Sequence, residues 1–284
     1  MIPDSSFARH ARAHRWSWLL VAAAVIGVAA CDSKITTSGT PGTWGFIIVP
    51  ASKNASGVYR TKPLAQFFKG NLTGGVPNSQ VIFDSCVTHV TYDPAPDPEI
   101  VSGPSISFLD AGDKVFLNIG GKPDTLLRIS TALSTTYQKS AVTPITYNPG
   151  DSIVVTIPGA TAGYPAAEIR GKTSEPFTMS DIDPRTDTLG IPVTWTPAAA
   201  PGSSMIISLR YQPLGATRIN TQVLCSFTDD GVDTIRYRWH RFWSDSNNEA
   251  RTVVATRLRT SIVQKTDGVL EILSRFQVPT PTSN

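Results

Sequence analysis

Histidine, cysteine and methionine are scarce in this sequence, and their scarcity excludes several kinds of site. The 284 residues contain four histidines, three cysteines and three methionines. Only His89 and His240 follow residue 31, too few for a histidine-rich zinc site, and no Cys-x-x-Cys spacing occurs. Both adjoin apolar strand-like runs, so we expect structural or exposed histidines and no catalytic one. Nothing in the sequence predicts a cofactor.

The motifs of two common enzyme classes are also missing. No Gly-x-Ser-x-Gly occurs, the pattern that places a nucleophilic serine on a strained turn. Gly171-Lys172-Thr173 resembles the end of a phosphate loop, but the glycine required five positions earlier is Ala166. The sequence therefore gives no catalytic residue for a serine hydrolase or a nucleotide hydrolase.

One uncharged apolar run near the start of the chain is too short to span a membrane. Arg9, Arg12 and Arg15 precede it, and small residues close it. From Leu19 to Ala30 it has 12 residues, whereas a spanning helix needs about 20. A basic start, a short apolar run and a small-residue end predict an export signal over residues 1–30.

The end of this signal carries a second indication. Val28-Ala29-Ala30-Cys31 resembles a bacterial lipobox, in which the cysteine becomes the lipid-modified first residue of the mature protein. The resemblance implies lipidation of Cys31 and an extracytoplasmic protein anchored to a bacterial membrane. An ordinary Ala-x-Ala cleavage with an incidental cysteine is the alternative. The following residues, rich in Ser, Thr, Gly and Pro, predict a flexible tether over residues 31–43.

The mature chain is expected to be almost neutral. Three of the 25 basic and one of the 22 acidic residues precede Cys31, which leaves 22 basic and 21 acidic side chains and a balance of +1. Without a lysine-rich run, this charge gives no reason to expect nucleic acid as a partner. Cys86 and Cys225 remain as an even pair in an oxidising compartment, which favours a disulfide over two separately buried thiols.

Short β-branched or aromatic runs recur from Trp44 onward and predict strands, because Pro, Gly, Asp or Asn bounds each of them. The 22 prolines argue against a helical bundle, and no fixed-period repeat suggests a solenoid. We therefore predict an all-β fold over residues 44–284, an antiparallel β-sandwich of Ig-like architecture, either one large sandwich or two smaller ones divided near residue 158. The runs are Phe46–Val49, Val81–Phe83, Ile106–Leu109, Val115–Ile119, Ile153–Ile157, Val193–Thr196, Met205–Tyr211, Thr221–Phe227, Val253–Val263 and Val269–Phe276.

A series of short motifs, from about Val81 to the C-terminus, resembles secreted bacterial β-sandwich modules of unassigned function in order and spacing. The resemblance implies the sandwich fold, matches both remaining cysteines and implies no activity. Residues 229–243 depart from it, because they are richer in Arg and Trp, so a function there would be this protein's own. The motifs are Cys86, Leu109–Gly112, Tyr137, Pro149–Asp151, Pro158–Gly159, Pro165–Ala166, Val193–Thr196, Ile206–Leu209 and Cys225–Phe227.

Paired carboxylates can cleave sugars, and four acidic residues could supply such a pair: Asp229, Asp230, Asp233 and Glu271. The three Asp residues surround Gly231, and Asp together with Gly also forms ordinary turns. A carbohydrate-active enzyme is therefore an alternative, and the first expectation is that none of these residues is catalytic.

A second acidic set could bind calcium, which takes 6–8 oxygen ligands. Asp181, Asp183 and Asp187 stand at alternating positions in a Pro-containing loop, but the spacing and the final Glu of an EF-hand are absent. A solvated acidic loop explains the same residues.

The stretch Ile235–Trp243 interleaves cations with aromatic rings and fits two secondary structures. As a strand it would place Ile235, Tyr237 and Trp239 on one face and Arg236, Arg238 and His240 on the other, outward face. As a helix it would group Ile235, Trp239, Phe242 and Trp243. An outward basic strip, with Arg257 and Arg259 alongside, would suit a sugar or an acidic polymer, whereas core on one face and solvated arginines on the other is the plainer explanation. The ligand-binding candidates are Arg236, Arg238, Trp239, His240, Arg241 and Trp243.

These observations favour a lipid-anchored extracytoplasmic protein with a non-enzymatic binding or structural role at the cell envelope. Its expected partners are the membrane, through the lipid anchor, and a carbohydrate or an envelope protein.

Overall fold

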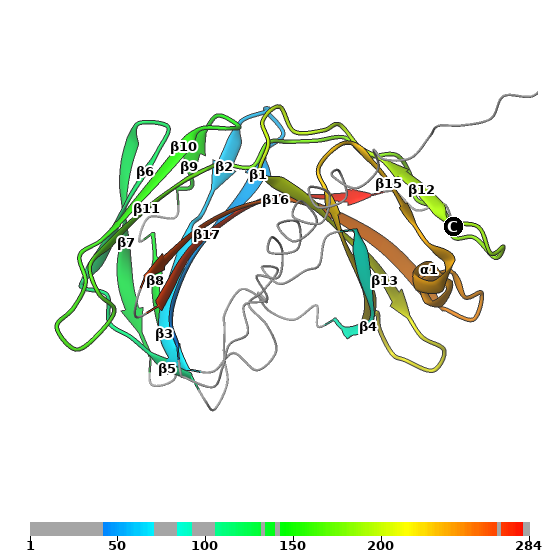
Figure 1. Ribbon diagram of the computed structural model, residues 1–284, viewed down its shortest axis with the longest axis horizontal. Coiled ribbons are helices and arrows are strands. Elements are labelled where there is room, and N and C mark those ends of the chain that lie inside the picture. The colour runs from blue at the N-terminus through cyan, green and yellow to red at the C-terminus, as the bar shows by residue number, and fades with distance from the viewer. Residues whose placement is uncertain are drawn as a thin grey trace, which may run out of the picture. The chain divides into compact units, whose positions relative to one another are not determined.

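The computed structural model describes residues 42–70, 84–92, 106–131, 134–139, 143–265 and 268–280. Within these residues the fold is almost wholly β, as predicted, with 17 strands and one short helix (Figure 1). No helix in this part of the chain is both long and apolar enough to cross a bilayer. Cys31, the export signal and the predicted run Val81–Phe83 lie outside the described residues.

Each predicted run within the described residues overlaps a strand, whereas β2, β3, β4, β7, β8, β9, β11 and β15 were not among the predicted runs. β1 begins two residues inside the predicted tether, because Gly42 and Thr43 already pair with β3. The first eleven strands are β1 (Gly42–Lys53), β2 (Tyr59–Thr61), β3 (Leu64–Gly70), β4 (Ser85–Thr91), β5 (Ile106–Phe108), β6 (Lys114–Ile119), β7 (Lys122–Ser130), β8 (Thr135–Gln138), β9 (Ile145–Tyr147), β10 (Ser152–Ile157) and β11 (Ala167–Lys172). The others are β12 (Ile191–Thr194), β13 (Ser203–Gln212), β14 (Thr221–Thr228), β15 (Val232–Ile235), β16 (Ala250–Lys265) and β17 (Gly268–Thr280), and the helix is α1 (Tyr237–Ser244).

Fifteen of these strands belong to one sheet, with the main order β11-β10-β6-β7-β8-β3-β1-β17-β16-β13-β14-β4. Strands β12 and β15 form a separate two-stranded sheet. The pairs between described strands are antiparallel, as predicted, except that β1 and β17 run parallel. A parallel pair cannot be joined by a tight hairpin, and here the two partners are the first and last strands of the fold.

The first core is apolar and lies where the sheet curls back on itself. Strand β11 packs against β16 and β17, so the inner faces of β6, β10 and β11 meet those of β1, β3 and β17. Alternation of inward and outward side chains along β10, buried at Ile153, Val155 and Ile157, shows why a period of two predicts this strand.

The second core lies between strands β13, β14 and β16 of the large sheet and the two-stranded sheet β12-β15. The large sheet contributes inward residues such as Ile207, Cys225 and Ala255, and Val193 and Trp195 face them from the other layer. The arrangement is sandwich-like, with α1 completing the cover through Trp243.

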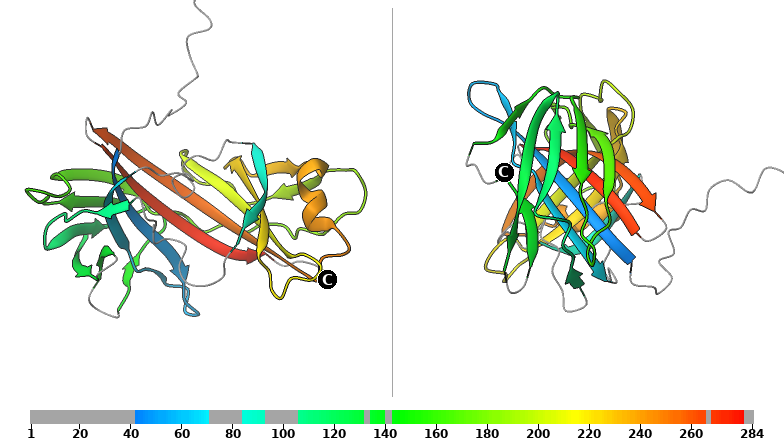
Figure 2. Two further views of the ribbon diagram at one scale, coloured as in Figure 1. Left: turned by 90° about the horizontal axis from the view of Figure 1, so that it is seen from below. Right: turned by 90° about the vertical axis from the view of Figure 1, so that its left-hand side faces the viewer.

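The long hairpin β16-β17 (Figure 2) contributes side chains to both cores. Val253 and Phe276 pack in the second core, whereas Leu270 and Ile272 pack in the first. The described residues from Gly42 to Thr280 belong to one compact unit.

The predicted division near residue 158 falls at a turn and not between the cores. Gly159, with φ 82°, turns the chain between β10 and β11, and a Cβ there would meet the backbone nitrogen of Ala166 at 2.4 Å. Strand β11 still belongs to the first core through Ile169, and the next residue along the chain that packs in the second core is Phe177. The chain therefore passes from one core to the other within residues 170–176.

Buried polar contacts hold this passage in place. The backbone N–H of Ser174 donates to Ser274 Oγ at 2.8 Å, and Ser174 Oγ donates to the carbonyl oxygen of Arg257 at 2.9 Å. Next to them, Arg259 binds the carboxylate of Glu175 through two hydrogen bonds of 2.8 and 2.7 Å. Because these groups are buried, each needs its partner, which fixes the junction of the two cores.

Candidate functional site: the arginine and aromatic surface of α1

The stretch Ile235–Trp243, for which the sequence allowed a strand or a helix, is a strand at its start and a helix after it. Strand β15 ends at Ile235, and α1, a helix of about two turns, begins at Tyr237. In the helix, His240 and Trp243 point inward and are buried, so the strand interpretation, which placed His240 on an outward basic face, is wrong. The helical grouping is the correct one, because Trp239 and Phe242 also pack against the second core.

Hydrogen bonds from the buried side of α1 fix a helix that is too short to be stable alone. His240 Nε2 lies 2.8 Å from the carbonyl oxygen of Leu189 and therefore carries the proton, and its Nδ1 lies 3.1 Å from Ser244 Oγ. Trp243 Nε1 donates to the carbonyl oxygen of Arg210 at 3.2 Å. His240 is thus structural.

The C-terminal carbonyl groups of α1 are also satisfied. Asn248 Nδ2 donates to the carbonyl oxygens of Phe242 and Trp243 at 2.8 and 3.0 Å, and Arg251 Nε donates to Trp243 at 2.8 Å. Side chains that follow the helix in the sequence therefore satisfy carbonyl groups that the end of a helix leaves without a partner. The result is a rigid platform on the surface of the second core.

Three exposed arginines, Arg236 just before α1 and Arg238 and Arg241 within it, each lie over an aromatic ring. The guanidinium carbons of Arg236 and Arg238 lie 5.8 and 4.4 Å from the ring centre of Trp239, and that of Arg241 lies 4.6 Å from Phe242. Among the described residues, none of the three has a carboxylate within ion-pair distance. Arg236, Arg238 and Arg241, with the three rings of Tyr237, Trp239 and Phe242, are called the α1 surface below.

A hollow of about 370 Å³ adjoins the α1 surface. Its wall includes Tyr237, Arg241 and Phe242 from α1, with Arg185 and Thr186 from the loop before β12. Arg185 binds Asp187 through hydrogen bonds of 3.1 and 2.7 Å, and this partner lowers the pKa of Asp187. Among the described residues, Arg241 is therefore the cation of the hollow whose donors have no hydrogen-bond or ion-pair partner.

Edge strand β4 contributes a further ring. The imidazole of His89 is exposed and lies 4.3 Å, centre to centre, from the ring of Phe242. Its backbone has φ 58°, in the left-handed region, where the pairing of β4 with β14 shifts register between Gln222 and Leu224. Such an irregularity re-aims a side chain, and here it turns His89 toward α1.

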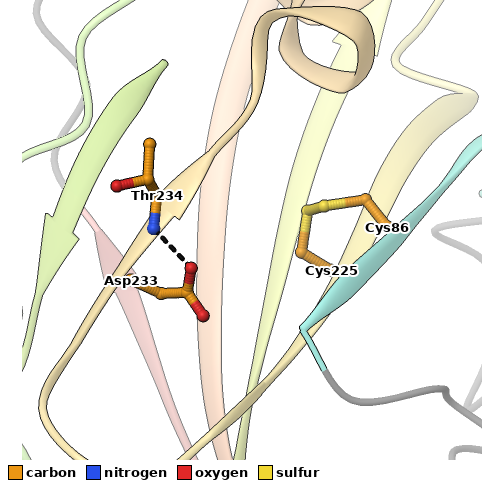
Figure 3. Close-up of a disulfide and its surroundings, with 4 residues drawn as sticks. All are labelled: Cys86, Cys225, Asp233 and Thr234. Carbon is orange, nitrogen blue, oxygen red and sulfur yellow. Dashed lines mark hydrogen bonds between the residues drawn. A yellow bond between two sulfur atoms is a disulfide. The ribbon is translucent and has the colours of Figure 1, made fainter. Parts of the chain in front are cut away.

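The disulfide fastens β4 to the second core (Figure 3). Cys86 on β4 stands directly opposite Cys225 on β14, and the two are bonded, as the even cysteine pair predicted. The separately buried thiols are thereby excluded. Because β4 pairs in the described structure with β14 alone, this bond helps to hold the strand that carries His89.

The four acidic residues of the enzyme alternative lie in different surroundings. Asp229 is buried and accepts hydrogen bonds from Trp195 Nε1 at 2.8 Å, Ser203 Oγ at 2.6 Å and Arg257 Nε at 2.7 Å, so its oxygens are fully engaged. Glu271 lies on the opposite face of the sheet, opposite Phe46 on β1. Asp230 and Asp233 lie nearer each other, and burial together with the charges of Asp84 and Asp230 raises the pKa of Asp233.

Arg257 and Arg259 do not extend the basic surface, contrary to expectation. Both are buried on the inner face of β16, Arg257 bound to Asp229 and Arg259 to Glu175. Each guanidinium also donates to backbone carbonyls, of Pro176 and Pro201 among others, and these hydrogen bonds compensate for the loss of water on burial. Charge alone gave no sign of this in the sequence.

The calcium candidates do not converge either. Among the described residues, no group of three His, Cys, Asp or Glu side chains is arranged to hold a metal ion. Asp187 is held by Arg185, and Asp181 and Asp183 are exposed on the same loop.

A larger hollow of about 420 Å³ lies over β6, β7 and β10, with Phe116, Asn118 and Thr156 in its wall. The charged residue in its wall, Asp124, forms an ion pair with Lys139, so this hollow presents no uncompensated charge to a ligand. The α1 surface is the stronger candidate because its cations have no ion-pair partner within the part of the chain that the structure describes.

No protein-family model matches the chain, and neither a characterised protein nor a solved structure is significantly similar to it. Fold and site together define an all-β, sandwich-like protein with one disulfide and a rigid arginine and aromatic surface. The likeness to secreted β-sandwich modules remains a prediction.

Proposed function

We propose that this chain is exported, held at a bacterial membrane by lipid on Cys31, and has a non-enzymatic binding or structural role at the cell envelope. The observation that carries the proposal is the use of its three cysteines. Cys86 and Cys225 are bonded to each other, and stable disulfides belong to oxidising compartments outside the cytoplasm. The third cysteine ends the apolar signal in a lipobox-like sequence.

The binding role is supported by the unpaired arginines of the α1 surface. Exposed cations usually pair with carboxylates or move freely in water. The guanidinium groups of these three arginines instead lie on the rings of Trp239 and Phe242. A carbohydrate or an envelope protein is the expected partner. The carbohydrate-active alternative would be favoured if the purified chain released reducing sugar from a polysaccharide that it binds.

Replacement of the lipobox cysteine tests the anchor. Cys31→Ala should prevent lipidation, and the chain should move from the membrane fraction to the soluble fraction, because stable attachment depends on the acyl chains. Ser33→Ala, two residues away, is the matched control and should stay with the membrane. Cys31→Ala protein that remains with membranes after a salt wash would contradict the lipoprotein assignment.

A further inference from the structure

The three arginines of the α1 surface stand within six residues of each other on a chain that is otherwise nearly balanced in charge. Two acidic groups lie close by: Asp233, whose pKa the charge of Arg236 lowers in part, and Asp245, which lines the same hollow as Arg241 and whose Oδ1 accepts from the side chain and backbone of Asn247. Neither forms an ion pair with them. The excess charge is thus positive and local, and its complement is an anion.

We propose that the α1 surface, with His89 of β4, is a docking site for an acidic polysaccharide bearing carboxylate or sulfate groups. This assignment rests on the proposed binding role and names its ligand class. Arginine suits it because the planar guanidinium fork binds carboxylate and sulfate oxygens through two parallel hydrogen bonds.

The arginines are arranged in advance for such binding. Contact with the rings of Trp239 and Phe242 restricts the guanidinium groups, so less conformational freedom is lost when an anion binds. Residues three apart on a helix, such as Arg238 and Arg241, are neighbours on its surface. Two guanidinium groups can therefore meet successive acidic groups of one polymer.

The surroundings favour a sugar over a bare anion. The hollow beside Arg241 combines the rings of Tyr237 and Phe242, both partly exposed, with the hydroxyl groups of Thr186 and Ser246. A pyranose ring presents an apolar C–H face and hydroxyl groups, which rings and hydroxyls recognise together. The left-handed backbone of His89 adds a third ring at the same place, at a cost in conformational energy that the fold bears.

The test is binding of the full chain, purified in nonionic detergent so that the result does not depend on the lipid anchor. The probes are polygalacturonate, dextran sulfate, uncharged dextran and polyglutamate. We expect binding to the two acidic glycans, with no binding to dextran and weaker binding to polyglutamate. Binding should weaken as salt rises from about 50 mM to about 200 mM.

Variants locate the site. Arg236→Ala, Arg238→Ala and Arg241→Ala combined should weaken glycan binding by about tenfold or more, and the same three changes to Lys should give an intermediate loss, because charge is kept without the planar fork. The control removes equal charge at the exposed Lys62, Lys69 and Lys172 and should change binding less than about twofold. Circular dichroism checks that all variants are folded.

Two results would overturn the assignment. If the control at Lys62, Lys69 and Lys172 weakened binding as much as the three Arg→Ala changes, the effect would be one of general charge. If polyglutamate bound as tightly as the acidic glycans, the surface would be an anion site with no preference for sugars. Neither result bears on the lipid anchor, which the Cys31→Ala fractionation tests separately.

Discussion

The first core and the second core bury different kinds of groups. The first is filled with aliphatic and aromatic side chains, and its ion pairs, Arg128 with Asp110 and Lys139 with Asp124, are partly exposed to water. The second contains the disulfide and an ion pair between Arg257 and Asp229 whose side chains are 1% and 2% exposed. It also supports α1 through the buried His240 and Trp243.

The two cores therefore contribute differently to the fold. An apolar core stabilises without fixing unique partners, whereas buried polar groups must each find one and so hold neighbouring loops in place. The more highly constrained second core is the one that carries the short helix, the edge strand β4 and the α1 surface.

The largest expected effect tests this contrast at the buried ion pair. Arg257→Ala leaves Asp229 buried without its cation and should lower the free energy of unfolding by about 3–5 kcal/mol. The matched change in the first region, Arg128→Ala, should lower it by about 1 kcal/mol or less, since that pair is partly exposed. Urea unfolding of both variants measures the difference, and equal losses would remove the contrast.

The disulfide gives the second effect. Cys86→Ala combined with Cys225→Ala opens a link across 139 residues, and the free energy of unfolding should fall by about 2–5 kcal/mol. Native hydrogen exchange should show the loss concentrated in β4 and β14, with β6 and β10 little changed. Uniform loss of protection over both cores would mean that the bond does not act on the second core in particular.

The third prediction concerns β17, which the two cores share. Burial raises the pKa of Glu271 from 4.5 to about 8, so between these values the folded chain holds a proton that the unfolded chain releases. Stability should therefore fall as pH rises through this window, by about 2 kcal/mol between about pH 5 and 7. Glu271→Gln should remove this part of the decline in melting temperature; an identical slope in both proteins would show that Glu271 ionises freely.

The fold was predictable because its signals are local. Alternation in Ile153–Ile157 and turn residues such as Pro158-Gly159 report strand and turn directly, and the even cysteine pair indicated the disulfide. Some motifs are structural for reasons that become visible only in space: the hydroxyl of Tyr137 accepts from the N–H of Ala111 at 2.7 Å and donates to the carbonyl oxygen of Gly112 at 2.9 Å.

The site was only partly predictable because burial is not local. The stretch that carries α1 was singled out by its arginines and rings, but periodicity over nine residues could not decide between strand and helix. His240 and Arg257 look like surface residues in the sequence, and contacts from Leu189 and Asp229, 51 and 28 residues away, bury them. His89 was missed as a neighbour of Phe242, since no pattern connects β4 to α1.

Arginine labelling tests most directly whether the second region alone presents the binding surface. Phenylglyoxal modification of the full chain, followed by peptide mass spectrometry, would be compared with and without polygalacturonate. The reference is Arg170 on β11 in the first region, whose side chain is 74% exposed. We predict protection of Arg236, Arg238 and Arg241 with unchanged labelling of Arg170. Protection of Arg170, or none at the three α1 arginines while the polymer is bound, would contradict the account.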